Sequence, residues 1–558
     1  MPDEPHSPAS SYAGRWVARL RGKVIAQGGT PELARRAAKS SRYKENPEIL
    51  YMPASFSIPP LIEKIKEILP ADQEAYLVGG AVRDLLLNRL SRDFDFAVPS
   101  NGISLARRVA NKLNADYMTL DDERNTGRVI VTESNGTRIF LDFATYRGNS
   151  LEADLRARDF TINALAYDLR NGTIIDPLEG AFDLRAKRIR ACSQTSFMDD
   201  SVRILRAVRL AAGLGFQIEK ETRELMKQAA AQIERVSPER LRDELFKILE
   251  GPKPDASIRA LEMLGVVNHL MPELLEMKRV EQSPPHVYDV WTHTIAVLGE
   301  LENILNALRV GYSADDTNDL FTGLLTLRLG RFREQFAKHF AQSLNPDRSV
   351  RALLFFAALY HDARKPQTKT FDEEKGRIRF FDHDIQGAEL AAKRARAFNL
   401  SNDEIQRLQA IIENHMRIHF HAGRMEGENK SPSRRAIYRF FRDSGGAGVE
   451  LVLLSLADLR GTRANTLTQE TWSAYLDVCR IFLENYWEKP EDTVAPPRLL
   501  NGDDLMHELD LQPGPIVGDL LEAIRERQAI GKIDTREQAI EYAREWLNSR
   551  QSLEQSEK

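Results

Sequence analysis

Two carboxylates, Asp93 and Asp95, are separated by a single phenylalanine in the segment RDFDFAV. The alternation of polar and apolar residues predicts a strand, whose period of two places both carboxylates on one face. Two like charges side by side repel each other, and Mg²⁺ relieves that repulsion because carboxylate oxygens are its natural ligands. The pair therefore predicts metal-assisted phosphoryl chemistry.

A glycine turn precedes these aspartates. Gly79 and Gly80 follow the apolar run AYLV and open the helical segment AVRDLLLN, so their backbone N–H groups can approach a nucleotide phosphate at the start of a helix. Arg83, one turn into that helix, would bring a guanidinium to the same oxygens. Two-metal catalysis often uses a third carboxylate, and Asp142 in the alternating segment RIFLDFATYR is the candidate.

These residues must be held by more than one domain, because a chain of 558 residues is too long for a single hydrophobic core. Helices and strands alternate up to about residue 190, which predicts an α/β head, and helical periodicity dominates afterwards. A small ββα unit precedes the head, and the proline-rich stretch 44–60 is interpreted as a linker. The predicted boundaries are 1–50, 51–190, 191–282, 283–487 and 488–558.

Composition excludes some classes of protein. The net charge of −4 does not indicate a protein that binds polyanions over its whole surface, so any nucleic-acid contact should be a local basic patch. No apolar run approaches the roughly 20 residues of a membrane-spanning helix, and the first residues do not resemble a signal peptide. Cys192 and Cys479 lie far apart, which indicates neither a disulfide framework nor a thiolate metal site. We expect a cytoplasmic protein.

Four blocks in order resemble the class II tRNA nucleotidyltransferase and bacterial poly(A) polymerase family. They are LVGGAVRDLLLN with DFD, RARDFTINALAYD at 156–168, DPLEGAFDLRAKRIRA at 176–191 and DDSVRILRAVRLAAGLGF at 199–216. The resemblance implies a polymerase-β-like nucleotidyltransferase head, a mainly α-helical body at 191–282 that selects the nucleotide and binds RNA, and a helical tail. It also implies that Asp93 and Asp95 are catalytic ligands of Mg²⁺.

The same resemblance implies roles for further residues that contact the nucleotide. Asp200 and Arg203 are expected three residues apart on one helical face, where a carboxylate acceptor and a guanidinium donor can read the edge of a base. In the family this pair selects C or A without a template. The remaining positions implied to bind the nucleotide are Arg158, Asp159 and Asn163 in the RDFTINA block, and Arg206 and Arg209 along the helix.

The reaction that the resemblance implies is addition of CMP and AMP to the 3′ end of tRNA. Two departures from the family pattern, Asp199 for glutamate and Ala157 within an arginine run, remove no essential donor or acceptor. The segment 121–131 resembles the flexible loop that lets CCA-adding enzymes switch from C to A, which argues against a purely CC-adding enzyme. A-adding, CC-adding and poly(A) polymerase activities remain open on the same scaffold.

Functions of other classes remain as alternatives. These are a phosphohydrolase whose head only binds nucleotide or RNA, a non-catalytic RNA-binding protein, and an antibiotic nucleotidyltransferase. The intact acids of the head weigh against the first, and the long helical tail weighs against the last. The expected partners are the tRNA 3′ end, ATP and CTP, with no DNA and no membrane, and composition leaves the oligomeric state open.

Histidines predict a second site, since eight of the eleven fall between residues 286 and 421. The pattern of His293, then adjacent His361 and Asp362, then Asp458 resembles the HD superfamily of metal-dependent phosphohydrolases, which implies an α-helical HD domain at 283–487 and a divalent metal. His383 and His415 fit a second metal. Arg364 replaces the usual glycine of HDxGK, so metal binding is expected more firmly than hydrolysis. Three other histidines are interpreted as structural: His339, His419 and His421.

Overall fold

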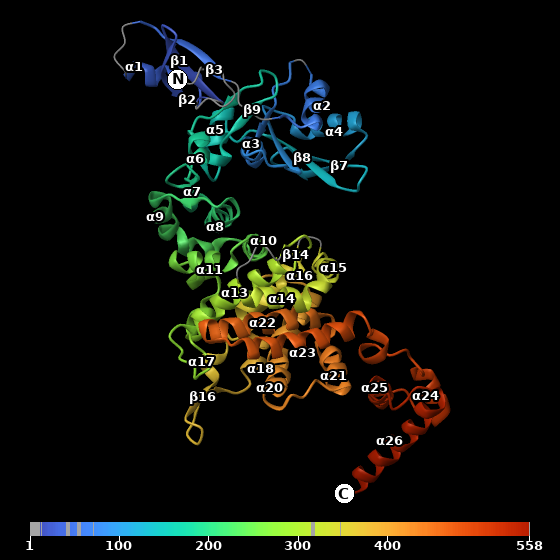
Figure 1. Ribbon diagram of the computed structural model, residues 1–558. Helices are drawn as coiled ribbons and strands as arrows, with labels where there is room; N and C mark the ends of the chain where they lie inside the picture. The colour runs from blue at the N-terminus through green and yellow to red at the C-terminus, as the bar shows by residue number, and fades with distance from the viewer. Residues whose placement is uncertain are drawn as a thin grey trace. The chain divides into compact units, whose positions relative to one another are not determined.

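The computed structural model describes residues 12, 14–40, 45–52, 57–70, 72–313, 319–345 and 348–556, and it divides into two compact units, Met1–Val236 and Ser237–Lys558 (Figure 1). Unit 1 holds a mixed sheet with helices, and unit 2 is almost entirely helical. This confirms the predicted class, an α/β head followed by helical domains. Within the described residues, no helix is long and apolar enough to cross a membrane.

The N-terminal unit contains a three-stranded antiparallel sheet in which β1 lies between β2 and β3. Its elements are β1 (Arg15–Leu20), β2 (Lys23–Gly28), α1 (Pro31–Ser40) and β3 (Glu48–Met52). The interpretation of 44–60 as a linker is therefore wrong for 48–52, where Tyr51 pairs with Trp16. β3 forms because it pairs with the edge of β1 that β2 does not occupy, and the local sequence of 48–52 does not reveal this distant partner. Residues 44 and 53–56 of that stretch lie outside the described residues.

The head is built on a seven-stranded sheet with the order β10-β9-β4-β5-β8-β7-β6, in which β5 and β8 are parallel and the other pairs antiparallel. Its strands are β4 (Tyr76–Val78), β5 (Asp93–Val98), β6 (Asp116–Asp121), β7 (Thr126–Thr132), β8 (Arg138–Thr145), β9 (Ala166–Asp168) and β10 (Ile174–Ile175). Its helices are α2 (Pro60–Ile68), α3 (Gly80–Leu86), α4 (Gly102–Leu113), α5 (Leu151–Arg156), η1 (Thr161–Asn163) and α6 (Gly180–Arg185).

Alternation along β5 orients the two aspartates. Phe94 and Phe96 are buried in the core under the sheet, and the ring of Phe96 stacks on that of Phe143 with centroids 4.5 Å apart. Because successive side chains point to opposite faces, Asp93 and Asp95 lie on the other side and remain exposed. The apolar face thus anchors the strand that presents the acids.

Short helices complete unit 1 after the head. They are α7 (Ser196–Asp199), α8 (Arg203–Leu214), α9 (Lys220–Ala229) and η2 (Ala230–Arg235), with β11 (Arg188–Ile189) parallel to β12 (Gln217–Ile218). One face of α8 is buried, which includes Ile204, Leu205 and Val208, while its arginines point elsewhere. The helix is therefore fixed by packing, and Arg203, Arg206 and Arg209 lie on its less buried side.

Unit 2 packs its helices around α22, in which nearly every side chain is buried. The helices up to the tail are α10 (Pro238–Glu250), α11 (Pro254–Met263), α12 (Val267–Leu270), η3 (Pro272–Met277), α13 (Val290–Ala307), α14 (Leu320–Leu329), η5 (Gly330–Phe332), α15 (Arg333–Phe340), α16 (Val350–Tyr360), α17 (Lys365–Thr368), α18 (His383–Ala397), α19 (Asn402–Asn414), α20 (Met416–Glu428), α21 (Arg434–Ser444), η6 (Gly445–Ala447), α22 (Gly448–Arg463), η7 (Ala464–Thr466) and α23 (Gln469–Trp487). The short strands are β13 (Ser343–Asn345), β14 (Arg348–Ser349), β15 (Lys369–Asp372) and β16 (Arg377–Phe380), the last two forming a hairpin that projects from the helices (Figure 1).

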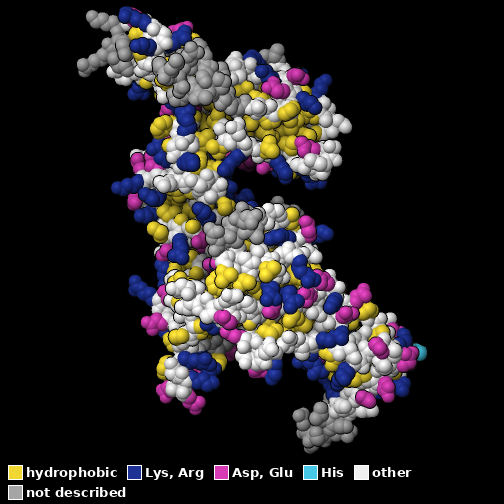
Figure 2. Space-filling view, viewed as in Figure 1, with side chains coloured by type: hydrophobic (Ala, Val, Ile, Leu, Met, Phe, Trp, Pro, Cys, Tyr) yellow, Lys and Arg dark blue, Asp and Glu magenta, His cyan; other side chains and the backbone are white. Residues whose placement is uncertain are grey.

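The tail has a small apolar core of its own, which includes Leu505, Leu520 and Ile524. Its elements are η8 (Pro490–Val494), α24 (Gly502–Leu509), α25 (Pro515–Ala529) and α26 (Arg536–Ser556). On the face shown in Figure 2, basic and acidic side chains are intermingled, in keeping with the net charge of −4. A contact with a polyanion must therefore depend on local groups.

Candidate active sites

A transverse row of side chains crosses the sheet of the head at one level. Val78 on β4 pairs with Asp95 on β5, Asp95 with Asp142 on β8, and Asp142 with Arg128 on β7. Residues that are partners on neighbouring strands project from the same face of a sheet. Asp142 and Asp95 are therefore direct neighbours on the face that also carries Asp93.

The negative charges of the carboxylates in this row are only partly balanced by neighbouring arginines. Arg128 donates through Nε and Nη2 to the two oxygens of Asp142, each at 2.7 Å. Although Asp95 keeps solvent-accessible surface, neighbouring protein groups crowd its carboxylate, and this desolvation is the main cause that raises its pKa above the ordinary value. The carboxylates of Asp142 and Asp93 raise this pKa further, while Arg158 lowers it. A crowded carboxylate of this kind favours a divalent cation over a proton near neutral pH.

The glycine turn joins β4 to α3 beside the acids. Gly79 has φ +75°, and a Cβ atom there would lie 2.8 Å from Nη1 of Arg158, so any larger residue would displace that guanidinium. Arg158 is held by Asp154 at 3.0 Å. Arg83 folds beside Gly80 and pairs with Asp84. The turn, its two arginines and the acids of β5 thus lie at one end of the sheet.

Residues of the RDFTINA block form a hydrogen-bonded connection between α3 and α8. Arg83 Nη1 donates to Asn163 Oδ1 at 2.8 Å, and Asn163 Nδ2 donates to Asp159 Oδ1 at 3.0 Å. The other oxygen of Asp159 pairs with Arg206 Nη2 at 2.9 Å. Although burial opposes ionisation, Arg206 and Asn163 lower the pKa of Asp159. Asp159 and Asn163, predicted to contact nucleotide, therefore also orient the two arginines.

The expectation that Asp200 and Arg203 share one helical face is wrong. α7 ends at Asp199, Asp200 has extended backbone angles, and α8 begins at Arg203. A turn still joins the pair, because the N–H of Arg203 donates to the carbonyl of Asp200 at 3.2 Å. The Arg203 guanidinium bonds to the carbonyls of Ala157 and Arg158 and to Ser196, while Arg206 and Arg209 do follow it on α8. Local sequence could not reveal this break.

The segment 121–131 differs from the loop that was expected. Only a short turn separates β6 from β7, and residues 126–131 belong to a strand of the sheet. That strand carries Arg128, which was not predicted as a site residue, although the β-branched run VIVT at 129–132 indicated a strand. Arg128 is the residue that holds Asp142, so the segment contributes directly to the acidic row.

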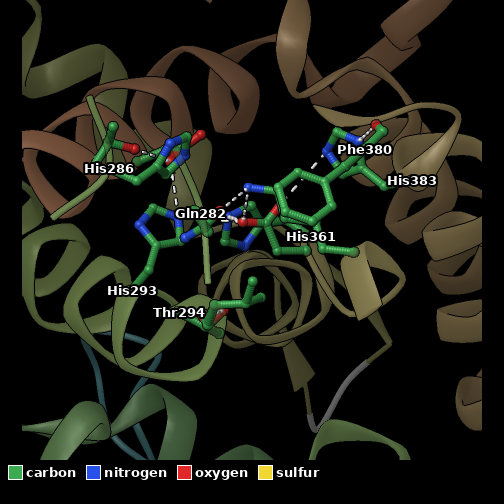
Figure 3. Close-up of polar contacts among 12 residues, drawn as sticks. Gln282, His286, His293, Thr294, His361, Phe380 and His383 are labelled. Carbon is green, nitrogen blue, oxygen red and sulfur yellow. Dashed lines mark hydrogen bonds and ion pairs between the residues drawn. The ribbon is translucent and has the colours of Figure 1, made fainter. Parts of the chain in front are cut away.

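Unit 2 brings six predicted metal ligands together in one buried cluster, of which His293, His361 and His383 are labelled in Figure 3. The Nε2 atoms of His293 and His361 lie 3.4 Å apart, and those of His383 and His415 lie 3.3 Å apart. Asp362 lies between the two pairs: its Oδ2 is 3.4 Å from His293 Nε2 and 3.3 Å from His361 Nε2, and its Oδ1 is 3.5 Å from His383 Nε2. Asp458 Oδ1 completes the set at 3.1 Å from His293.

Backbone carbonyls fix how three of these imidazoles are oriented. Nδ1 of His361, His383 and His415 lies within 2.6–2.8 Å of the carbonyls of Ala358, Phe380 and Ile412 respectively. A neutral imidazole that donates through Nδ1 presents a lone pair on Nε2. Two such lone pairs facing each other across 3.3 Å repel unless a cation lies between them. The donor set therefore fits divalent metal ions.

Lys365 Nζ lies 2.7 Å from Oδ2 of Asp362 and balances part of its charge, while Oδ1 lies 3.5 Å from His383 Nε2 and 3.9 Å from His415 Nε2. A buried carboxylate whose two oxygens face imidazole nitrogens on opposite sides can bridge two metal ions. Burial and neighbouring imidazoles lower the pKa of His415 to about 3, so it remains a neutral ligand. The residues present thus fit one or two metal ions.

One of the histidines interpreted as structural contacts the cluster. His419 Nε2 lies 2.8 Å from Asp458 Oδ2, and its Nδ1 lies 3.0 Å from the hydroxyl of Tyr475. His339 pairs with buried Glu450 at 2.9 Å, in line with a structural role. Lys365 was missed, although its place in the HDARK segment beside His361 was a usable signal.

The fold and these two sites define the class of protein: a nucleotidyltransferase that also carries an HD domain. Family models match as follows: a poly A polymerase head domain at 75–190, a probable RNA and SrmB-binding site of polymerase A at 215–278, an HD domain at 333–458, and a putative tRNA nucleotidyltransferase domain 2 at 496–543.

Similar proteins agree with this class over most of the chain. An A-adding tRNA nucleotidyltransferase from Deinococcus radiodurans is 32% identical over 86% of this chain and 96% of its own length. A CC-adding tRNA nucleotidyltransferase from Thermus thermophilus is 30% identical over 86% of this chain and 95% of its own length. A solved CCA-adding enzyme in complex with CTP has the same fold, with a TM-score of 0.56 at 22% identity over 88% of this chain and 96% of that one. The chain belongs to the tRNA nucleotidyltransferase family.

Proposed function

We propose that the head adds CMP and AMP to the 3′ end of tRNA, completing or repairing a CCA end with CTP and ATP as donors. The observation that carries this proposal is the row in which Asp142 lies beside Asp95, on the face that Asp93 shares and next to the glycine turn. Membership of the tRNA nucleotidyltransferase family supports the choice of tRNA as the acceptor.

The 3′ oxygen of the tRNA forms a bond to the α-phosphorus, the bond from that phosphorus to the bridging oxygen breaks, and pyrophosphate leaves as the 3′ hydroxyl loses its proton. Asp93 and Asp95, with Asp142 beside them, would hold Mg²⁺, which supplies charge stabilisation to attacking and leaving oxygens. Arg83 and Arg158 lie beside Gly80 and Gly79 and bind the phosphates. Positioning accounts for most of the rate enhancement.

The turn that joins α7 to α8 carries the residues that select the base. Asp200 supplies acceptors and Arg203 supplies donors for the edge of an incoming base, and Arg206 and Arg209 on α8 face the triphosphate. Contacts from Arg203 to the carbonyls of Ala157 and Arg158 tie this turn to the block that carries the phosphate-binding arginine. The base-selecting and phosphate-binding groups are thus held in one hydrogen-bonded framework.

Addition of A alone or C alone is the second candidate. It is favoured by the relatives that match 86% of this chain, which are named A-adding and CC-adding enzymes. tRNA transcripts ending before the first C, after the second C and after the terminal A, incubated with CTP and ATP separately and together, separate these activities. CCA completion supports the first candidate. Addition of only A or only C supports the second, and a long A tail would indicate a poly(A) polymerase.

For the HD domain, we propose a divalent metal centre that hydrolyses phosphate esters at RNA ends. Water adds to phosphorus, the ester bond breaks, and the alcohol leaves with a proton. His293, His361, Asp362 and Asp458 would hold one metal, with His383 and His415 as ligands of a second, and the metal would supply a nucleophilic hydroxide. Lys365 pairs with Asp362 and lies at the position of the lysine in HDxGK, while Arg364 occupies the glycine position. Loss of hydrolysis in His361→Ala with nucleotide addition retained tests this proposal.

RNA recognition should depend on shape and backbone contacts, because one enzyme must accept many tRNAs. We propose the helices after residue 215 as the main platform, where a family model for RNA binding matches. The free cysteines Cys192 and Cys479 fit a reducing compartment, and we place the activity in the cytoplasm on that basis.

A further inference from the structure

The small N-terminal unit, formed by β1, β2, α1 and β3, is docked closely on the head. The hydroxyl of Tyr51 on β3 accepts a hydrogen bond from the N–H of Ile174 at 3.0 Å, and its ring packs against the apolar core of the head. The N–H of Asp176 donates to the carbonyl of Gly29 at 2.9 Å. A Cβ atom on Gly29 would overlap the carbonyl oxygen of Asp176, so only glycine permits this approach. The N-terminal unit is therefore fixed against the head.

Arg15, at the start of β1, contacts the same segment of the head. Its side chain is only 4% exposed, its Nη2 pairs with Oε2 of Glu179, and its Nη1 lies 3.8 Å from Oδ2 of the fully buried Asp176. The other oxygen of Glu179, Oε1, accepts a hydrogen bond from the N–H of Gly29 at 3.1 Å. Both oxygens of Glu179 are thus held by the N-terminal unit, one of them by a charge-assisted contact.

The backbone of Glu179 explains why this residue needs such contacts. It lies in the left-handed region, with φ +61° and ψ +30°. A glutamate rarely adopts this conformation, because its Cβ atom crowds a carbonyl oxygen, whereas glycine adopts it freely. A strained residue of this kind persists only where its surroundings hold it in place. The contacts from Arg15 and Gly29 to its carboxylate supply that support.

The turn at Glu179 determines where α6 begins, and α6 lies against the RDFTINA block. Asp176 Oδ1 accepts a hydrogen bond from the N–H of Gly180, the first residue of α6, at 2.7 Å. A Cβ atom on Gly180 would overlap the carbonyl oxygen of Thr161 on η1. The hydroxyl of Thr161 donates to Oδ2 of Asp183 on α6 at 2.6 Å, and both residues are fully buried. A shift of α6 would therefore displace η1.

The segment η1 also carries a residue that orients a phosphate-binding arginine. Asn163, two residues after Thr161, accepts the hydrogen bond from Arg83 Nη1 at 2.8 Å and donates to Asp159 at 3.0 Å. Arg83 lies beside Gly80 in the turn that is proposed to bind the triphosphate. Direct contacts thus connect the N-terminal unit, the turn at Glu179, α6, η1 and the guanidinium of Arg83.

We propose that the N-terminal unit positions Arg83 by holding Glu179 in its left-handed conformation, with Arg15 as the positioning residue. The inference rests on the proposed nucleotidyltransferase function and deepens it, since it gives the N-terminal unit a part in binding the triphosphate of CTP and ATP. Because Arg83 is assigned to the phosphates and not to the base, loss of Arg15 weakens the binding of both nucleotides equally.

Isothermal titration of the full chain with CTP or ATP and Mg²⁺, without tRNA, measures Kd and stoichiometry separately. Arg15→Ala should raise the Kd of both nucleotides by about fivefold with unchanged stoichiometry. A merely structural role would instead lower the stoichiometry, because part of the protein would be unfolded, and leave Kd unchanged. Arg19→Ala is the matched control, since Arg19 pairs with Glu48 inside the N-terminal unit, and it should keep the wild-type Kd. A wild-type Kd in Arg15→Ala would overturn the proposal.

Two substitutions of Glu179 test the conformational argument without changing Arg15. Glu179→Ala removes the carboxylate but keeps a Cβ atom in the left-handed region, so it should raise Kd as Arg15→Ala does. Glu179→Gly adopts the conformation without support and should keep the wild-type Kd, and adding Arg15→Ala to it should have no further effect. Equal Kd values in Glu179→Ala and Glu179→Gly would contradict the proposal. If tRNA transcripts are not extended, the proposed function fails, while these titrations still decide the role of Arg15.

Discussion

Asp95 and Asp142 are register partners on the parallel strands β5 and β8, so their carboxylates project from the same face of the sheet as direct neighbours. Their sequence separation of 47 residues conceals this relationship, and Arg128 on β7 extends the row by holding both oxygens of Asp142. The pairing supports the prediction that Asp142 is a third carboxylate of the nucleotidyltransferase site, and that role can be tested directly.

Asp142→Asn should lower kcat for nucleotide addition by at least about tenfold and raise the Mg²⁺ concentration needed for half-maximal rate, because the metal site loses a nearby charge. Asp95→Asn should lower kcat by about 100-fold or more. Asp116→Asn, at an exposed position of the same sheet, is the control and should leave both values unchanged. A wild-type Mg²⁺ dependence in Asp142→Asn would show that Asp142 only positions Arg128.

Arg203→Lys should relax base selection while addition continues. Lysine keeps the charge but lacks the planar fork that both reads a base and bonds to the carbonyls of Ala157 and Arg158. We expect the ratio of kcat/KM for the correct nucleotide over UTP or GTP to fall by about tenfold, measured with single nucleotides on defined transcripts. Arg223→Lys on α9 should keep the wild-type ratio. Unchanged selectivity in Arg203→Lys would contradict the assignment.

Divalent metal should stabilise the HD domain, because ions that bind only the folded state raise the free energy of unfolding. At a metal concentration 100-fold above Kd, the gain is about 2.7 kcal/mol. Thermal unfolding with and without Mn²⁺ or Zn²⁺, together with metal content by mass spectrometry, measures it. His361→Ala should lose both the bound metal and the shift in Tm. His507→Ala, at an exposed histidine of the tail, should keep both.

Asp176 should make the stability of unit 1 depend on pH. It is fully buried near Arg15 and accepts hydrogen bonds from the N–H groups of Gly180 and Ala181, and burial raises its pKa from 3.8 to about 6. Because the raised pKa means that the folded state binds the proton more tightly, the free energy of unfolding should fall as pH rises from about 4 to about 6. The loss is at most about 3 kcal/mol.

Trp16 on β1 offers a local signal for this effect, since it is the only tryptophan before residue 237. Unfolding by urea is followed by ¹⁹F NMR of protein labelled with 5-fluorotryptophan at pH 4.5 and pH 7. The difference in unfolding free energy between the two pH values should shrink in Asp176→Asn. An identical difference in both proteins would show that other groups control the dependence.

Much of the site could be predicted locally, because its chemistry is carried by short motifs. The DFD strand, the glycine turn and the adjacent His361 and Asp362 each combine residues within a few positions of one another, so periodicity alone places their side chains. The predictions were wrong where an element depends on contacts with residues that are distant in the sequence. β3 exists because β1 offers a free edge, and the break between Asp200 and Arg203 follows from packing of α7 and α8.

The class of chemistry follows from short motifs in the chain: two carboxylates on one strand face, a glycine turn that admits phosphate, and histidines in an HD pattern. Which of these groups meet depends on the tertiary fold. It placed Asp142 and Arg128 in the row of Asp95, joined Arg83 to Arg206 through Asn163 and Asp159, and brought His419 to Asp458. Strand register and helix packing are set by the burial of apolar faces that are distant in the sequence, whereas the chemistry of a motif is set by residues adjacent in the chain.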